Sequence, residues 1–143
     1  MNPLELSEQE AIRRNSLAML RQMGIEPYPA ALYPVDATST DIRANFKDDA
    51  SEQRQVCIAG RIMSRRIMGK ASFVELQDNA GRIQVYVARD EICPGEDKDL
   101  YNVVFKKLLD IGDIVGFKGF VFRTQTGEIT VHAREMTLLS SGL

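Results

Sequence analysis

Residue types that could grip a nucleic acid gather in one short stretch of the sequence, residues 61–87. Among its residues are four cations, an aromatic ring and an amide that could act together, namely Arg61, Arg65, Arg66, Lys70, Phe73 and Gln84. Cations attract phosphates, a ring stacks on a base, and an amide both donates and accepts hydrogen bonds at a base edge. The stretch therefore indicates binding of single-stranded nucleic acid.

Two strands must position these side chains. Alternating apolar residues predict strands over residues 72–77 and 82–88, and Asp78-Asn-Ala-Gly81 has the composition of the turn that joins them. A four-residue loop between antiparallel strands fixes which residues lie opposite each other. The register of this hairpin can therefore be written down directly.

In that register Phe73 lies opposite Tyr86, and Glu75 lies opposite Gln84. Strand parity points Val74 inward and Phe73 outward. Phe73 and Gln84, which are diagonal neighbours, then share one exposed face. Arg66 lies on the strand before them.

Each residue also has an ordinary structural explanation. Phe73 could pack beneath a helix, Arg65 and Arg66 could be a solvated edge pair that blunts aggregation, and Gln84 could be simple polar surface. Strand parity argues against the first explanation. Convergence of charge, ring and amide on one small face favours recognition of a base.

The composition predicts one compact core. The chain has 143 residues, of which 44% are hydrophobic, which suits a single domain. Cys57 and Cys93 lack the spacing of a disulfide framework or of a metal site, so both are interpreted as reduced thiols and no metal is expected. Neither a membrane span nor a signal peptide is visible, which predicts a cytoplasmic protein.

The charge is unevenly distributed. The formal net charge is -2, but no acid occurs between Glu52 and Glu75, where Arg54 and the four cations of the opening stretch lie. A phosphate responds mainly to charges within a Debye length of about 8 Å. The negative total is therefore weak evidence against a nucleic-acid partner.

The remaining elements complete a small barrel. Ser7 and Glu10 form a capping box that starts a helix ending at Gly24, and a proline-punctuated connector over residues 25–49 is expected to drape over the next domain, with a short helix around residues 39–46. Residues 1–52 would form this helix and connector, and residues 53–143 the barrel. Gly60, in the middle of the first strand, suggests a bend or bulge.

After the third strand a helix is predicted over about residues 96–111, followed by strands at about 114–123 and 128–139. A mainly β, five-stranded barrel with a helix between strands three and four is the OB-fold arrangement, which binds oligonucleotides on strands two and three. A mixed open sheet is the main alternative.

No catalytic residue is predicted. The single histidine, His132, lies in a strand without a recognisable nucleophile, and no carboxylate pair is placed for acid–base chemistry. Gly69-Lys70 is followed by Ala71 where a phosphate-binding loop needs Ser or Thr. The chain by itself is therefore expected to be a binding module.

The sequence resembles a known family in residues 64–78, 81–87, 105–115 and 127–132. These segments, above all the Arg-Arg-Ile-Met-Gly-Lys run at 65–70, are similar to the N-terminal anticodon-binding domain of class II lysyl-tRNA synthetases of the bacterial type. The resemblance covers nearly the whole chain. Aspartyl- and asparaginyl-tRNA synthetases share the barrel and the Arg, Phe, Gln spacing, but usually lack the run.

The resemblance implies roles for particular residues. Phe73 would stack on the central uridine of the UUU anticodon of tRNA(Lys), Arg66 and Gln84 would hydrogen-bond its edge, and Glu135 would contact a neighbouring base. Arg61, Arg65 and Lys70 are candidate contacts to the RNA backbone. The alternatives are a general single-strand binding OB-fold, an aspartyl or asparaginyl anticodon domain, and a barrel used for protein contacts.

The same resemblance implies a longer parent protein. Its catalytic domain would attach lysine to tRNA with ATP and Mg²⁺, and the parent would be a homodimer. The chain ends where the linker to such a domain would begin, so it is expected to be a truncated piece that is inactive alone, monomeric or weakly associating, and without a cofactor of its own.

Overall fold

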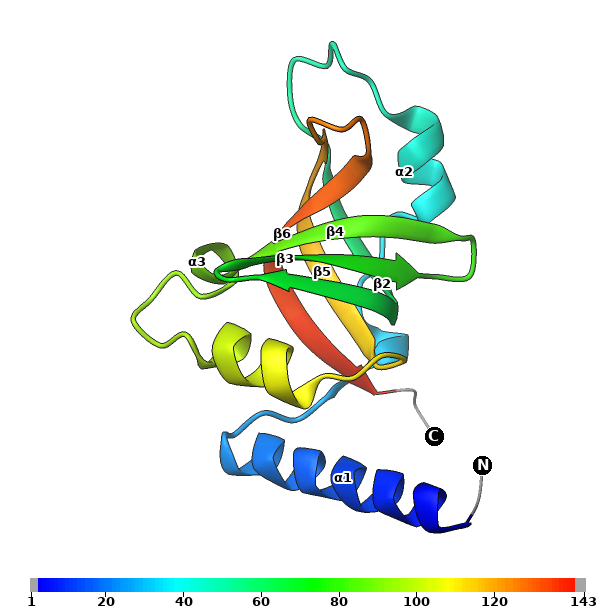
Figure 1. Cartoon of the computed structure of the whole chain (residues 1–143). Helices are drawn as coiled ribbons and strands as arrows, with labels where there is room; N and C mark the ends of the chain where they lie inside the picture. Colours follow the sequence, from blue (N-terminus) through cyan, green and yellow to red (C-terminus); the bar gives the residue numbers. More distant parts are fainter. Residues whose placement is uncertain (1–2, 141–143) are drawn as a thin grey trace.

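Five strands close into a barrel in the computed structural model, which describes residues 3–140 except for the side chains of residues 3–7, 9, 12 and 13 (Figure 1). They are β2 (Gln55–Met68), β3 (Ala71–Gln77), β4 (Arg82–Ala88), β5 (Ile114–Arg123) and β6 (Ile129–Ser140). Strand β2 pairs antiparallel with β3 and β5, and β3 with β4. Strand β6 pairs antiparallel with β5 and parallel with β4, which closes the barrel. The predicted mainly β OB-fold is confirmed.

The barrel interior is filled by the inward-facing residues that strand parity selects. All of the following are at most 4% exposed: Val56, Ile58, Ile62, Val74, Leu76, Ile83, Val85, Val87, Val115, Phe117, Val121, Val131 and Ala133. Fully burying a Val, Leu, Ile or Phe side chain contributes about 1.5–3 kcal/mol. Residues on the inner face therefore stabilise the barrel, and residues on the outer face are accessible to a ligand.

Helices pack around the barrel. The segment η2 (Leu100–Leu108), of π-type, lies between β4 and β5 as predicted, after the short helix α3 (Arg89–Ile92). Its Tyr101, Val104 and Phe105 are completely buried. Helix α1 (Pro3–Gln22) lies beyond η2, at the bottom of Figure 1, and touches the core through Leu20, and Met23 directly after the helix also packs against the core.

Helix α1 begins earlier than the capping box at Ser7 predicts. It starts at Pro3, and proline is favoured at the first helical position because its missing N–H is not needed there. The side chain of Ser7 lies outside the described residues. The predicted start of the helix was therefore wrong, and the predicted end near Gly24 is confirmed.

The connector drapes over the barrel, as expected. Its strand β1 (Tyr28–Pro29) pairs in parallel with the end of β6, and the turn η1 (Ala30–Leu32) follows. Tyr33 packs over Cys57. Helix α2 (Ser39–Asn45) then inserts Ile42, which is 1% exposed, into the main core.

Strand β2 changes partner halfway along its length. It pairs with β5 through Arg61 and with β3 from Arg61 onward, and the register slips by one residue between Ile62 and Ser64. The predicted irregularity therefore exists, but its extra residue is Met63, three residues beyond Gly60. Gly60 itself lies against the carbonyl oxygen of Gln77, where a Cβ would overlap that atom.

Asp78 ties helix α2 to the β3–β4 turn. Its carboxylate accepts the backbone N–H of Ser39 at 2.7 Å and the Ser39 hydroxyl at 2.8 Å. It also accepts the N–H groups of Ala80 and Gly81, both at 2.9 Å. Burial alone would raise the pKa of Asp78, but these hydrogen bonds outweigh it and hold the pKa below its usual value.

We expect Asp78→Asn to lower the free energy of unfolding by about 1–3 kcal/mol at pH 7, because an amide NH₂ would face one of the donors. The depressed pKa stabilises the fold above about pH 4, and this contribution is lost as the pH falls through the folded-state pKa. The difference between the two proteins should therefore shrink below about pH 4. Urea denaturation at a series of pH values checks this, with the exposed Asp49→Asn as the matched control. The prediction is contradicted if the difference in free energy of unfolding between Asp78→Asn and the unmodified chain stays the same at every pH.

Candidate nucleic-acid interface

A row of five side chains crosses the outer face of the barrel in register. Arg66 pairs with Phe73, Phe73 with Tyr86, Tyr86 with His132, and His132 with Phe120. Each comes from a different strand, in the order β2, β3, β4, β6 and β5. We call this set the register row.

The rings of the register row touch one another. Phe73 and Tyr86 have centroids 5.4 Å apart, and Tyr86 and His132 are 5.0 Å apart. His132 stacks on Phe120 at 4.6 Å with an interplanar angle of 20°. The four rings are half-buried, so an aromatic surface extends across four strands.

His132 enters this row as a neutral ring. Burial lowers its pKa below the usual value, Glu91 opposes that shift, and Arg134 adds to it. The Glu91 carboxylate oxygen lies 3.7 Å from Nε2, too far for a hydrogen bond. A neutral imidazole at pH 7 extends the apolar surface without adding a charge.

The structure brings together Arg66, Phe73 and Gln84. The Arg66 guanidinium carbon lies 5.6 Å from the centre of the Phe73 ring, and Glu75 faces Gln84 as the turn predicts. The Gln84 amide nitrogen donates to the hydroxyl of Thr130 at 3.0 Å. Among the described residues nothing donates to its carbonyl oxygen, which leaves that oxygen for a ligand.

Two clefts flank these three residues and share them as lining. The α2-side cleft, of about 540 Å³, is also lined by Arg43, Arg82 and Glu128. The turn-side cleft, of about 400 Å³, is also lined by Tyr86, Phe122, His132 and the turn residues 124–126. A base stacked on Phe73 would therefore have open space on both sides.

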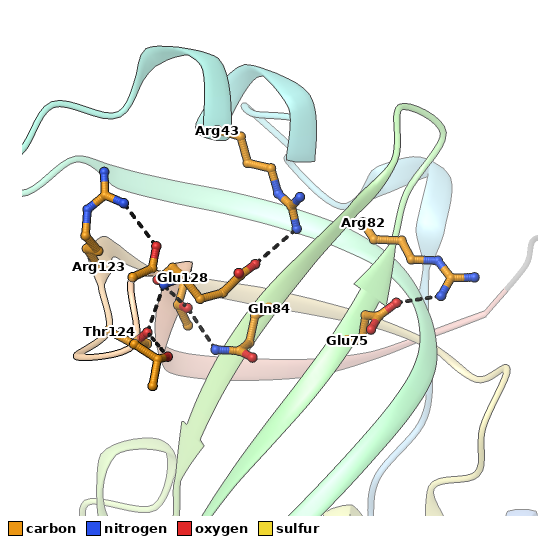
Figure 2. A network of polar contacts seen from close by, with 10 residues as sticks. Arg43, Glu75, Arg82, Gln84, Arg123, Thr124 and Glu128 are labelled. Atoms are coloured by element: carbon orange, nitrogen blue, oxygen red, sulfur yellow. Dashed lines mark hydrogen bonds and ion pairs between the residues drawn. The ribbon is translucent and has the colours of Figure 1, made fainter.

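Ion pairs border the α2-side cleft (Figure 2). Arg43 of helix α2 reaches Glu128, directly before β6, at 3.4 Å, and Arg82 contacts Glu75 at 2.5 Å. All four side chains are at least 41% exposed. Ion pairs this exposed contribute only about 0–1 kcal/mol to stability. A ligand can therefore separate them and bind any of the four side chains with little loss of stability.

Arg65 has a different role from its neighbour Arg66. Its guanidinium donates to the carbonyl oxygens of Phe105 at 2.6 Å and Leu109 at 2.8 Å, at the end of η2. It also lies 5.5 Å from the centre of the Phe105 ring. These contacts cap the helical segment, and Arg65 also lines the α2-side cleft.

The other two candidate backbone contacts are Arg61, in the middle of β2, and Lys70, in the turn after it. Arg61 donates to the carbonyl oxygen of Gly112 at 3.0 Å. Lys70 lies exposed in the turn after β2, beside Gly69 in a left-handed conformation with φ 64°. Of the three candidate backbone contacts, only Lys70 makes no polar side-chain contact with another described residue.

Glu135 lies elsewhere on the barrel. It is exposed on β6 opposite Lys118, and its charge acts on Tyr33 of the connector and on Cys57 of β2. It lines neither cleft. Two carboxylates do line the α2-side cleft, Glu75 on β3 and Glu128, and Glu128 lies seven residues before Glu135.

Sequence reasoning missed Glu128, Arg43, Phe122 and His132 as site residues. Glu128 and His132 reach the site because β6 pairs in parallel with β4, with Gln84 opposite Thr130. Such pairing joins residues 46 positions apart, and no local pattern encodes it. The glycine turn before Glu128 was the only local signal that β6 begins there.

The described residues contain no group of three or more His, Cys, Asp or Glu that could hold a metal ion. No helix among them is both long and apolar enough to cross a membrane.

A family model described as an OB-fold nucleic acid binding domain, of the tRNA anticodon type, matches residues 56–139. The match covers all five barrel strands except the first residue of β2 and the last residue of β6. It therefore includes every residue of the register row.

Whole-length similarity extends to lysine–tRNA ligases of several bacteria. The chain is 66% identical over 144 residues to that of Porphyromonas gingivalis, which covers 100% of this chain and 25% of the relative. It is 60% identical over 139 residues to that of Christiangramia forsetii, and 49% identical over 145 residues to that of Aeromonas salmonicida. The aligned parts are 97% and 98% of this chain, and 24% and 27% of those relatives. The chain thus spans about a quarter of the length of these relatives.

Proposed function

This chain belongs to the tRNA anticodon family of OB-fold nucleic acid binding domains, and on that premise we propose that it reads the UUU anticodon loop of tRNA(Lys). The convergence of Arg66, Phe73 and Gln84 on one face of the barrel is the observation that carries the proposal. The similarity to lysine–tRNA ligases supports lysine tRNA as the partner.

The chemistry of the three side chains suits a uridine. The half-buried Phe73 ring offers a stacking platform, and the exposed Arg66 offers donors to the carbonyl groups of the base. Gln84 already donates through its nitrogen to Thr130. Its free carbonyl oxygen can therefore accept the ring N–H of uridine, a group that cytidine lacks.

Glu128 is the better candidate for the carboxylate that contacts a neighbouring base. It lines the α2-side cleft together with Phe73 and Gln84, whereas Glu135 lines neither cleft. An ionised carboxylate only accepts hydrogen bonds, so it selects a base that presents an N–H. Arg43 holds this carboxylate at the edge of the cleft.

The activity of the longer protein is part of the same proposal. The relatives are named lysine–tRNA ligases, and we assign to this chain the recognition step of such a ligase, acting in the cytoplasm. Attachment of lysine, with its ATP and Mg²⁺, would belong to the three quarters of the relatives that this chain does not match.

Titration of three anticodon stem-loops tests the proposal. We expect the UUU loop to bind more tightly than a UCU loop by about five-fold or more, because cytidine would leave the Gln84 carbonyl oxygen without a donor. A GUC loop keeps the central uridine and changes both neighbours, so it reports on the reading of those neighbours, including any by Glu128. All three are compared at one salt concentration.

Other results would favour other functions. Equal affinity for all three loops, with a steep dependence on salt, would identify a general single-strand binding protein. The absence of any RNA-induced NMR shift at Arg66, Phe73 and Gln84 would identify a barrel used for protein contacts. Either outcome would overturn the anticodon proposal.

A further inference from the structure

A second pair of cation and ring lies at the far end of the register row. The guanidinium carbon of Arg134 lies 4.9 Å from the centre of the Phe120 ring, compared with 5.6 Å between Arg66 and Phe73. Within residues 3–140, neither guanidinium has a hydrogen bond or an ion pair. An exposed arginine with a stacked ring and no polar partner is suited to bind a nucleotide.

The two pairs are joined without a gap. Tyr86 and His132 bridge Phe73 to Phe120, with centroid distances of 5.4, 5.0 and 4.6 Å. The aromatic surface therefore runs from β3 across β4 and β6 to β5. OB-folds ordinarily bind oligonucleotides on the second and third barrel strands, which are β3 and β4 here.

An irregularity in β6 places Arg134 over Phe120. Lys118 faces Glu135 and Gly119 faces Ala133, so Arg134 is an extra residue without a partner on β5. Bulges of this kind redirect a side chain. Here the extra residue is exposed, on the same outer face as Phe120.

The charges along the row favour binding of phosphates at its two ends. Arg66 and Arg134 supply the cations, whereas Glu91 lies beside His132 in the middle, 3.7 Å from its Nε2. A carboxylate repels a phosphate at that place. An RNA strand that follows the row would stack bases on the Phe73 ring and on the guanidinium plane of Arg134, whose N–H edge can still donate to a phosphate.

We propose that Arg134 and Phe120 form a second RNA platform, which binds a loop nucleotide that flanks the triplet read at Phe73. The inference rests on the proposed function. A triplet is shorter than the roughly 4–16 nucleotides that one OB-fold contacts, so flanking nucleotides need protein surface. The flanking base stacks on the exposed guanidinium plane of Arg134, which Phe120 supports from below.

Abasic substitution in the anticodon loop tests the platform. Each loop position outside the triplet is replaced in turn by a nucleotide without a base, which keeps the phosphate. At one of these positions the change should weaken binding to the unmodified chain about five-fold or more. The Arg134→Lys variant keeps the positive charge but loses the planar stacking group. Its affinity should therefore not fall further when the base at this loop position is removed.

Lys118→Gln is the matched control, because it removes a neighbouring cation that no ring supports. This variant should retain full sensitivity to the abasic position. The platform is refuted if no flanking abasic position weakens binding, or if Arg134→Lys stays as sensitive as the unmodified chain. The triplet titration judges the proposed function separately, since discrimination of UUU from UCU does not depend on Arg134.

Discussion

Replacement of Phe73 by alanine is expected to weaken binding of a UUU anticodon stem-loop about ten-fold or more. Stacking of one base on an aromatic side chain contributes about 1–3 kcal/mol, and tenfold corresponds to about 1.4 kcal/mol. The ring is half-buried on the outer face and lies outside both hydrophobic clusters of the fold. Its removal should therefore reduce affinity and leave the barrel folded.

Tyr28→Ala is the control for this measurement. Tyr28 is 42% exposed, but it lies on β1 beside the end of β6 and lines neither cleft. Fluorescence or calorimetric titration should find unchanged affinity for this variant. If Phe73→Ala also binds as tightly as the unmodified chain, and circular dichroism shows an intact fold, Phe73 does not stack on the anticodon.

Replacement of Gly119 by alanine is expected to destabilise the barrel by about 3 kcal/mol or more. A Cβ at this position would overlap the carbonyl oxygen of His132 and touch the Ala133 backbone. The obstructing atoms are backbone atoms of the paired strand β6, so no side-chain rotation relieves the overlap. The ladder that closes the barrel would have to separate at this point.

Gly95→Ala provides the comparison, because nothing lies within 4 Å of a Cβ there and its φ is not positive. That change should be neutral or slightly stabilising, since it removes freedom from the unfolded chain. Thermal and urea denaturation of both variants measure the difference. Equal stability of the two would show that β5 and β6 can move apart at Gly119 without cost.

Local patterns were sufficient for much of the fold. The register of the β3–β4 hairpin, with Phe73 opposite Tyr86 and Glu75 opposite Gln84, followed from parity and one turn, and it is confirmed. The connector helix at α2 agrees with its predicted position, and a helical segment lies before β5 as predicted, although Leu100–Leu108 is shorter than the predicted residues 96–111. In each case, residues close in sequence determine the geometry.

The parts that could not be predicted depend on distant strands. The neighbours of Gln84 across the barrel are residues of β6, and their parallel register is set by barrel closure rather than by any turn. For the same reason the sequence could not distinguish Glu128 from Glu135. Arg65 and Arg66 look alike in sequence, but one faces η2 and the other faces Phe73.

The register row has a consequence for how such a barrel can diverge. Each of its members comes from a different strand and points away from the core. A substitution at one member alters the surface that meets the base, while the backbone ladder and the volume of the interior stay unchanged. Selection or design can therefore vary these positions one at a time, and a barrel of this kind can acquire a preference for another triplet without passing through an unfolded ancestor.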